Sequence, residues 1–396
     1  MPLYSIFRPP LLAAGIVILL LSGCGQPRPT LFAPSSLPRF HDDGNPASLQ
    51  QAVAAQRRYL ANLEDHAEFV IGGRIYTVEW LDQSLITFQE ILAGEPEQAE
   101  LDRLIRENFK IYQAGGRLEA DPGEMLVTGY YEPLLEGSLL PAPPFVYPLY
   151  ATPLDLVENT GARENKKIGR IDESGEFLPY WTREEIERSG VLAGSELVYL
   201  KDPFDAFLLH VQGSGKIRLR DGSIRALHYS GNNGHPYTSI GRKLVEDEIF
   251  RLEEVDTQKL RDYVADNQEK GAELLNANRR YIFFAWGESE HPRGSLGLEL
   301  TPGRSIAVDH RVLPAPAVAY LVSRRPLFDD RGVLERWQPL YRFVLAQDSG
   351  AAIRGPGRVD LFWGSGEYAE AAAGIMKESG SLYFLIQKQP GAADHE

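Results

Sequence analysis

Residues 348–364 read Asp-Ser-Gly-Ala-Ala-Ile-Arg-Gly-Pro-Gly-Arg-Val-Asp-Leu-Phe-Trp-Gly, and they carry a carboxyl, Asp360, inside an apolar run. The run 359–363 is typical of a strand in a protein core. A carboxylate costs several kcal/mol to remove from water unless it is hydrogen-bonded or functional. Burial also raises a carboxyl pKa, which is what a general acid needs near neutral pH. Asp360 is therefore the candidate acid.

Two more aspartates lie next to apolar runs in the same third of the chain. Asp309 occurs in Ala-Val-Asp-His, and Asp348 follows the run 342–347. Both could instead cap turns through neighbouring backbone N–H groups. That alternative stays open for each of them, and it is weakest for Asp360.

Composition limits the classes of function. The chain has 396 residues, which favours two domains, and a formal net charge of −14. A protein this acidic is unsuited to bind nucleic acid or an anionic membrane face by electrostatics. Its one cysteine, Cys24, excludes a disulfide framework, and the eight histidines lack metal-ligand spacing. We therefore expect no metal and no cofactor.

The first 23 residues are predicted to be a lipoprotein signal peptide. Arg8 is followed by the apolar run 11–21 and then by Leu-Ser-Gly-Cys24. The run is too short to span a bilayer comfortably. Acylation of Cys24 would anchor the protein without a membrane-spanning helix. A plain secretory signal with a chance cysteine is the alternative. Residues 24–46 are predicted to be a tether.

Periodicity indicates helices, then strands, then helices, then strands. Helices are expected at 78–93, 97–113, 183–189, 239–253, 257–277 and 367–377, after a first helix near 49–63 with Ser48 as its N-cap. Strands are expected at 126–131, 197–200, 206–212, 216–220, 225–229, 281–286, 304–309, 317–322, 342–347, 359–363 and 382–387. Asp221-Gly222 indicates a hairpin turn. We divide the fold into 47–130, 131–280 and 281–390.

Several segments besides 348–364 resemble one family. They are Val127-Thr-Gly-Tyr-Tyr-Glu-Pro133, Val211-Gln-Gly-Ser-Gly215 and Tyr229-Ser-Gly-Asn-Asn-Gly-His-Pro-Tyr237. Together they are similar to the membrane-bound lytic murein transglycosylase A family, with its three-aspartate domain. The resemblance implies a mainly β fold with accessory helices. In it, a double-psi β-barrel is interrupted by an inserted β domain, with a groove between the two. Val359 departs from the family's pattern, in which an aromatic residue precedes the catalytic aspartate.

The resemblance implies cleavage of peptidoglycan glycan strands without water, which leaves 1,6-anhydromuramic acid ends. Asp360 would be the catalytic acid and Asp348 a supporting carboxylate. The candidate substrate-binding residues offer aromatic faces or polar groups to sugars: Thr128, Tyr130, Tyr131, Gln212, Ser214, Tyr229, Tyr237 and Asp309.

Two other functions remain open at this point. One is a non-catalytic peptidoglycan-binding lipoprotein with an expansin-like barrel, and the other is a hydrolase that uses Asp348 as its second carboxylate. Gly25 after the lipidated cysteine is compatible with the periplasmic side of an outer membrane, if the source has two membranes.

Overall fold

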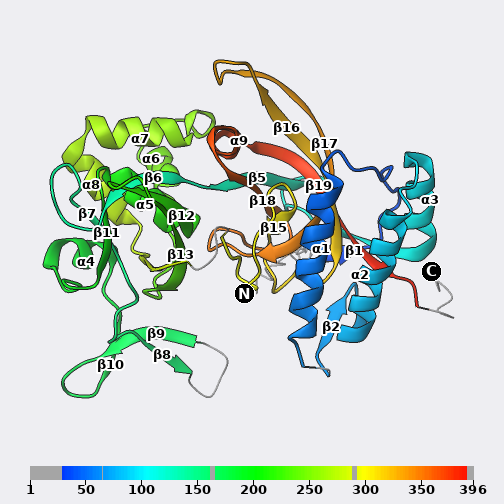
Figure 1. Cartoon of the computed structure of the whole chain (residues 1–396), viewed down its shortest axis with the longest axis horizontal. Helices are drawn as coiled ribbons and strands as arrows, with labels where there is room; N and C mark the ends of the chain where they lie inside the picture. Colours follow the sequence, from blue (N-terminus) through cyan, green and yellow to red (C-terminus); the bar gives the residue numbers. More distant parts are fainter. Residues whose placement is uncertain (1–28, 65, 161–165, 288–291, 390–396) are drawn as a thin grey trace, which may run out of the picture.

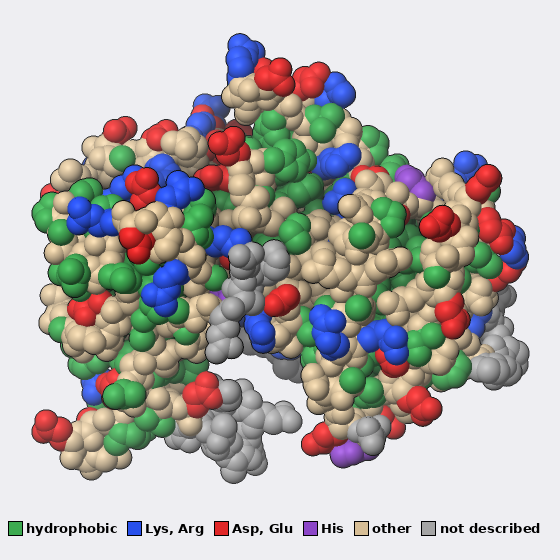
Figure 2. Space-filling model, in the orientation of Figure 1, with side chains coloured by type: hydrophobic (Ala, Val, Ile, Leu, Met, Phe, Trp, Pro, Cys, Tyr) green, Lys and Arg blue, Asp and Glu red, His purple; other side chains and the backbone are tan. Residues whose placement is uncertain are grey.

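The chain forms two parts joined by extended strands (Figure 1). The computed structural model describes residues 29–64, 66–160, 166–287 and 292–389. The predicted signal peptide and Cys24 lie outside the described residues. Within the described part of the chain, no helix has the length and apolar character needed to cross a bilayer. Figure 2 shows both signs of charge scattered over the visible face and the outline indented between the two parts.

The first part is a closed β-barrel. The ring closes because β19 pairs with β16 on one side and with β5 on the other. Its strands, in ring order, are β5 (Met125–Glu132), β18 (Arg358–Ser365), β15 (Ser305–Ala307), β17 (Leu334–Asp348), β16 (Val318–Phe328) and β19 (Lys377–Gln387). Two neighbouring pairs, β5 with β18 and β15 with β17, run parallel. The barrel and its inserted domain confirm the predicted fold class.

Helices and short strands cover one side of the barrel (Figure 1). The helix α1 packs on β17, and α2 packs on β19. The elements before the insert are β1 (Leu31–Phe32), α1 (Pro46–Ala61), β2 (Glu68–Ile71), β3 (Arg74–Thr77), α2 (Val78–Ala93), α3 (Gln98–Asn108) and β4 (Phe109–Ala114). A last helix, α9 (Glu367–Ile375), packs on β5 and β18.

The predicted tether is wrong for the residues that the structure describes. The strand β1 pairs with β4, and Phe40 is completely buried in the core. The carboxyl of Asp42 accepts two hydrogen bonds from the buried guanidinium of Arg304, at 2.6 and 2.7 Å. Proline, serine and glycine made this segment look like a linker, but its aromatic and acidic side chains have long-range partners.

The inserted domain is a curled sheet with helices packed on it. The sheet runs in the order β14 (Ile282–Trp286), β13 (Ile224–Asn232), β12 (Ser214–Leu219), β6 (Leu134–Ser138), β11 (Glu196–Leu200) and β7 (Tyr147–Tyr150). A parallel bridge between Ala151 and Phe284 joins its two edges. The helical elements are α4 (Arg183–Ser189), α5 (Pro203–Gln212), α6 (Ile240–Glu246), η1 (Leu252–Glu254), α7 (Thr257–Asp266) and α8 (Gln268–Ala277). A small sheet of β8 (Val157–Thr160), β9 (Lys166–Ile171) and β10 (Phe177–Pro179) projects from it (Figure 1).

The predicted strand 206–212 is wrong, because this segment is the helix α5. Asp202 accepts hydrogen bonds from the N–H groups of Phe204 and Asp205, and Pro203 occupies the first turn. Gly213 ends the helix with φ of 80°, a left-handed conformation that glycine adopts without strain. These start and stop signals outweigh an apolar run that looked like a strand. Gln212 therefore lies at the end of a helix.

Three further local predictions are confirmed by the structure, and several predicted element bounds are wrong. The capping box of Thr182 and Glu185, the bounds 78–93 and the hairpin at Asp221-Gly222 are confirmed. The predicted N-cap Ser48 is wrong, since Asn45 caps α1. The predicted helix 97–113 ends at Asn108 and continues as β4, and 257–277 is two helices that meet at Asn267. The strand β14 belongs to the inserted sheet, so the boundary at 280 is about six residues too early.

Candidate active site

Asp360 lies near the start of β18, on the face of the strand that points out of the barrel core. Its backbone pairs with Ala307 of β15 and with Thr128 of β5. Val359 and Leu361 are fully buried, whereas Asp360 keeps part of its surface accessible. Successive side chains of a strand point to opposite faces. The apolar neighbours in sequence therefore pack the core and do not surround the carboxyl, contrary to the sequence-based expectation.

The carboxyl of Asp360 has few partners. The hydroxyl of Thr128 donates a hydrogen bond to it, and Arg358 Nη2 lies 3.4 Å from the Thr128 Oγ1 atom. Desolvation raises the pKa of Asp360, and the charge of Arg358 and the hydroxyl of Thr128 partly oppose this. Asp360 therefore has a carboxyl that takes up a proton more readily than an exposed one.

Asp348 lies at the end of β17 and is held by three donors. Its Oδ1 atom accepts the backbone N–H groups of Ser295 and Ser349, each at 2.8 Å, and its Oδ2 atom accepts the Tyr130 hydroxyl at 2.9 Å. Burial raises the pKa of Asp348 to about 6, although these donors lower it. A Cβ atom at Gly294 would lie 2.4 Å from the carbonyl oxygen of Gln347, so glycine lets this loop approach Asp348.

Tyr130 follows Thr128 by two residues on the same strand and is hydrogen-bonded to Asp348. It is on β5, its hydroxyl bonds to Asp348, and its ring lies 5.2 Å from the ring of Phe362. Burial raises the pKa of Tyr130, and the charges of Asp348 and Asp360 add to this effect. The tyrosine therefore remains a neutral donor next to two acidic groups.

Asp309 has a different environment. It is only 5% exposed, and it accepts hydrogen bonds from Arg311 Nε and Nη2 at 2.8 and 2.7 Å and from the N–H of Gly355 at 2.8 Å. The hydrogen bond from the Arg311 side chain is the main reason that the pKa of Asp309 lies well below its ordinary value. Asp309 thus ties the end of β15 to the loop before β18, and it is not a contact for sugar as predicted.

The other predicted substrate residues divide into buried and accessible ones. Tyr131 is 4% exposed and its hydroxyl donates to Glu370 at 3.0 Å, so it is a core residue and the prediction for it is wrong. The Oε1 atom of Gln212 accepts the Tyr131 N–H at 3.4 Å, which leaves its amide nitrogen for other partners. Ser214 begins β12 and is partly accessible.

Two tyrosines of the inserted domain remain candidates. Tyr229 is 49% exposed and its hydroxyl accepts a hydrogen bond from Asn232 at 2.7 Å. Tyr237 is partly buried. Burial raises the pKa of Tyr237, and a side-chain hydrogen bond with Ser239 and the charge of Arg358 partly oppose this. The structure therefore brings Thr128 to Asp360 and Tyr130 to Asp348 by hydrogen bonds, with Thr128 and Tyr130 on the same strand.

Sequence reasoning missed Arg358 and Ser295. Arg358 precedes Asp360 by two residues, so on a strand it shares its face, and that spacing could have been used. Ser295 contributes only its backbone N–H, which any residue except proline supplies, and no sequence signal identifies it.

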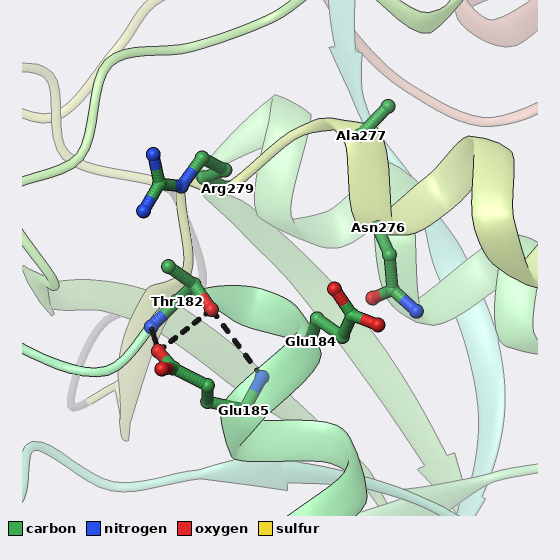
Figure 3. A pocket seen from close by; sticks show the side chains of 6 residues that line it. All are labelled: Thr182, Glu184, Glu185, Asn276, Ala277 and Arg279. Carbon is green, nitrogen blue, oxygen red and sulfur yellow. Dashed lines mark hydrogen bonds between the residues drawn. The ribbon is translucent and has the colours of Figure 1, made fainter.

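The described hollows in the surface lie elsewhere. One of about 440 Å³ is lined by Thr182, Glu184, Glu185, Asn276, Ala277 and Arg279, between α4 and the end of α8 (Figure 3). A neighbouring one of about 220 Å³ contains Trp181 and His235. Thr182 and Glu185 are mutually hydrogen-bonded in the capping box. Neither hollow includes a predicted site residue, so the candidate site rests on the carboxyls and their partners.

In residues 29–389, apart from the gaps named above, no group of three or more His, Cys, Asp or Glu side chains is placed to hold a metal ion. The chemistry that these residues themselves can perform is proton transfer by a carboxyl, next to neutral hydroxyl donors.

Comparison with known proteins gives consistent matches. Residues 126–285 match the family model described as the MltA specific insert domain, and residues 304–386 match the 3D domain. The chain is 30% identical over 276 residues to membrane-bound lytic murein transglycosylase A of Vibrio cholerae, a match that covers 68% of each chain. It is 24% identical over 340 residues to a homolog from Buchnera aphidicola, covering 85% of this chain and 84% of the other.

Solved structures share the fold. A membrane-bound lytic murein transglycosylase from Agrobacterium tumefaciens matches with a TM-score of 0.68 and 27% identity, over 86% of this chain and 93% of that one. MltA of Escherichia coli with bound chitohexaose matches with a TM-score of 0.68 and 22% identity, over 91% and 95% of the two chains. This second likeness shows the fold alone.

Proposed function

Because this chain belongs to the membrane-bound lytic murein transglycosylase A family, we propose that it is a lytic transglycosylase acting on peptidoglycan. The bond cleaved is the β-1,4 link between N-acetylmuramic acid and N-acetylglucosamine. The observation that supports this most is the environment of Asp360. It is partly accessible, its pKa is raised by desolvation, and within the described residues its hydrogen-bond donor is the neutral hydroxyl of Thr128.

Asp360 acts twice in the proposed reaction. First its protonated carboxyl donates the proton to the glycosidic oxygen while the bond from that oxygen to the anomeric carbon breaks. The 6-hydroxyl of the same muramic acid then attacks the anomeric carbon, and the Asp360 carboxylate accepts the hydroxyl proton. The carboxyl is thereby restored and no water is consumed. Attack within one sugar benefits from proximity, which can supply several kcal/mol.

Asp348 supports this acid in the proposal. Its carboxyl is occupied by Ser295, Ser349 and Tyr130, so it is poorly placed to activate water. Its negative charge is close enough to raise the pKa of Tyr130. A negative charge near the scissile bond would also stabilise positive charge that develops at the anomeric carbon.

Sugar binding is proposed to use stacking and neutral polar groups. Tyr229 offers an exposed ring and Tyr237 a partly buried one, and Gln212 and Ser214 offer hydrogen bonds from the inserted domain. The Thr128 hydroxyl uses its proton in the hydrogen bond to Asp360.

Localisation follows from the N-terminal residues and from the relatives' names. We propose a lipid anchor at Cys24 that holds the enzyme on the periplasmic side of the outer membrane, where it takes part in cell-wall turnover. The relatives are named membrane-bound. Labelling with a radioactive fatty acid, with Cys24→Ser as the control, tests the anchor.

The activity is tested by mass spectrometry of purified peptidoglycan after incubation with the chain lacking residues 1–24, beside its Asp360→Asn variant. Anhydromuropeptides from the first and none from the second are expected. Products with added water would replace the proposal with a hydrolase that uses Asp348. Absence of products from folded protein that binds glycan would replace it with the non-catalytic binding lipoprotein.

A further inference from the structure

The hairpin of β2 and β3 presents an apolar pair to solvent. Val70 and Ile75 lie directly opposite each other in its register, and they are 73% and 58% exposed. Because opposite residues of an antiparallel pair lie on the same face, the two side chains form one apolar patch beside the Gly72-Gly73 turn. The next pair on that face, away from the turn, is Glu68 and Thr77. The apolar end of this outer face is therefore the end at the turn.

The inner face of the hairpin is fixed on the barrel part. Ile71 and Tyr76 are buried in the main core, and the Tyr76 hydroxyl lies 3.0 Å from the hydroxyl of Tyr112 on β4. A Cβ atom at Gly72 would lie 2.0 Å from the ring of Tyr112, so the turn rests directly on that ring. In Figure 1 the hairpin lies next to the lower end of α1. These contacts hold the outer apolar pair facing away from the protein.

The strand β4 also receives the chain that comes from the proposed lipidation site. It pairs with β1, and just beyond it the N–H of Gly115 donates to the Thr30 carbonyl at 2.8 Å. Tyr112 and Gly115 are three residues apart, which is about 10 Å of extended chain. Pro29 follows Cys24 by five residues, so even a fully extended chain between them spans at most about 18 Å. Acyl chains on Cys24 would therefore hold the bilayer surface close to the hairpin turn.

We propose that Val70 and Ile75 rest on the lipid surface to which the chain is anchored, so that the hairpin is a second point of membrane contact. This inference rests on the proposed lipid anchor at Cys24, and a lipid surface is the occupant that the chain length brings to this place. Two apolar side chains are too few to hold a protein on a bilayer alone, but the anchor gives them a high effective concentration there. Their burial among headgroups and acyl chains removes apolar surface from water. A second contact sets which side of the barrel part faces the membrane.

The test places a fluorescent reporter of polarity at the patch in the full, lipidated chain. Cys24 is the only cysteine, and the proposed anchor uses its sulfur, so Val70→Cys supplies the one free thiol for a nitrobenzoxadiazole label. The matched control is Val333→Cys, since Val333 is a valine 56% exposed between β16 and β17, on the opposite side of the barrel part in Figure 1. Both proteins are bound to vesicles of phosphatidylethanolamine and phosphatidylglycerol. A second set of vesicles also contains a phospholipid with a nitroxide quencher near the top of its acyl chain.

The label at position 70 is expected to emit at shorter wavelength on vesicles and to lose about half of its emission to the quencher lipid. The label at position 333 should show neither change. In the chain lacking residues 1–24 both labels should stay in water, because the pair alone does not bind. Adding Ile75→Glu to the labelled Val70→Cys chain should reduce the quenching, since a carboxylate opposite the label resists leaving water. Both positions are exposed, so the substitutions leave the core intact.

A label at position 70 that stays in water on vesicle-bound protein, or equal quenching of both labels, would overturn the hairpin contact. A label at position 70 that leaves water without vesicles, and more so at higher protein concentration, would assign the patch to a second copy of the chain instead. Flotation of the vesicles is measured first. Protein that does not float with them lacks the anchor, and the hairpin contact fails with it. Failure of the anchor is thus distinguished from failure of the hairpin contact before any label is read.

Discussion

Two aspartates near the ends of paired strands have opposite environments. Asp309 follows β15 and Asp360 lies in β18, and these strands are hydrogen-bonded neighbours in the barrel. Asp309 accepts hydrogen bonds from Nε and Nη2 of Arg311 and from the backbone N–H of Gly355, and its pKa is lowered. Asp360 accepts one from the Thr128 hydroxyl, and its pKa is raised. Burial alone does not make an acid, since the number and charge of the donors decide which form the site favours.

The largest difference between the two should appear in turnover. Asp360→Asn is expected to lower kcat by about 10³-fold, because the amide cannot donate a proton to the leaving oxygen. Asp309→Asn should keep most of the activity per folded molecule. Both variants should still sediment with insoluble peptidoglycan. Loss of binding and turnover together in Asp360→Asn would indicate misfolding and not loss of an acid.

A substitution at Thr128 should change the pKa of Asp360, because the Thr128 hydroxyl is hydrogen-bonded to that carboxyl. Thr128→Val removes the one hydroxyl that stabilises the ionised form of Asp360, so the pKa of Asp360 should rise further. The descending alkaline limb of the kcat/KM profile should then move to higher pH. The maximum should fall about tenfold, since the carboxylate is less stabilised when it forms. Thr128→Ser keeps the hydroxyl and should resemble the parent. A profile that does not move in Thr128→Val would contradict the role of this contact.

Asp309 should matter for stability. Asp309→Asn loses charge-assisted hydrogen bonds with Arg311 and Gly355 and should unfold more easily by about 2 kcal/mol at pH 7. Because the folded-state pKa is lowered, the contribution is present above the pKa of the unfolded chain and is lost as pH falls below about 4. Urea unfolding at several pH values measures this. A difference that stays constant down to pH 3 would contradict the ionic origin.

Glu132 extends the comparison, because its pKa is raised like that of Asp360 although it is not the proposed acid. It is 2% exposed, its Oε1 atom has no hydrogen-bond partner among the residues that the structure describes, and Lys216 Nζ is 3.6 Å away from its other oxygen. Burial raises its pKa to about 7, although it is not accessible to a glycan. A raised folded-state pKa contributes stability below the unfolded value near 4.5, and this contribution is lost as pH rises through 7.

Glu132→Gln should therefore be more stable than the parent at pH 8, by about 1 kcal/mol once the lost attraction to Lys216 offsets part of the gain. The difference should vanish near pH 5. Thermal unfolding at both pH values measures it, with exposed Glu136→Gln as the control. A variant that is less stable at pH 8 would show that the Lys216 contact outweighs the desolvation of the carboxyl.

Much of the candidate site could be predicted from the sequence, because its residues lie in short contiguous motifs. Asp360, Thr128 and Tyr130 were all predicted to belong to the site, and the structure brings them together with Asp348. Their roles could not be predicted in the same way. The sequence does not distinguish Asp309 and Tyr131 from the other candidate residues. In the structure Asp309 is hydrogen-bonded to Arg311, and Tyr131 is hydrogen-bonded to Glu370. Which face of a strand a side chain occupies depends on pairing with distant strands.

The elements of the fold also divide into those with strong local sequence signals and those that depend on distant residues. Helices with strong local signals, such as 78–93 and the capping box at Thr182, were predicted well. The apolar run 206–212 indicates a strand, but the cap residue Asp202 and the stop residue Gly213 make the segment 203–212 a helix. The predicted tether 24–46 is wrong over its described residues because their partners, such as Arg304, lie more than 250 residues away in the sequence.

The contrast between Asp309 and Asp360 can be measured directly by carbon-13 NMR of protein labelled at the aspartate carboxyls. The two signals are assigned by their disappearance in Asp309→Asn and Asp360→Asn, and are then followed as pH is varied. The account predicts that Asp360 titrates above the ordinary range for aspartate, while Asp309 remains ionised to the lowest pH at which the protein is folded. An Asp360 that titrates at or below the ordinary value would contradict its assignment as the acid.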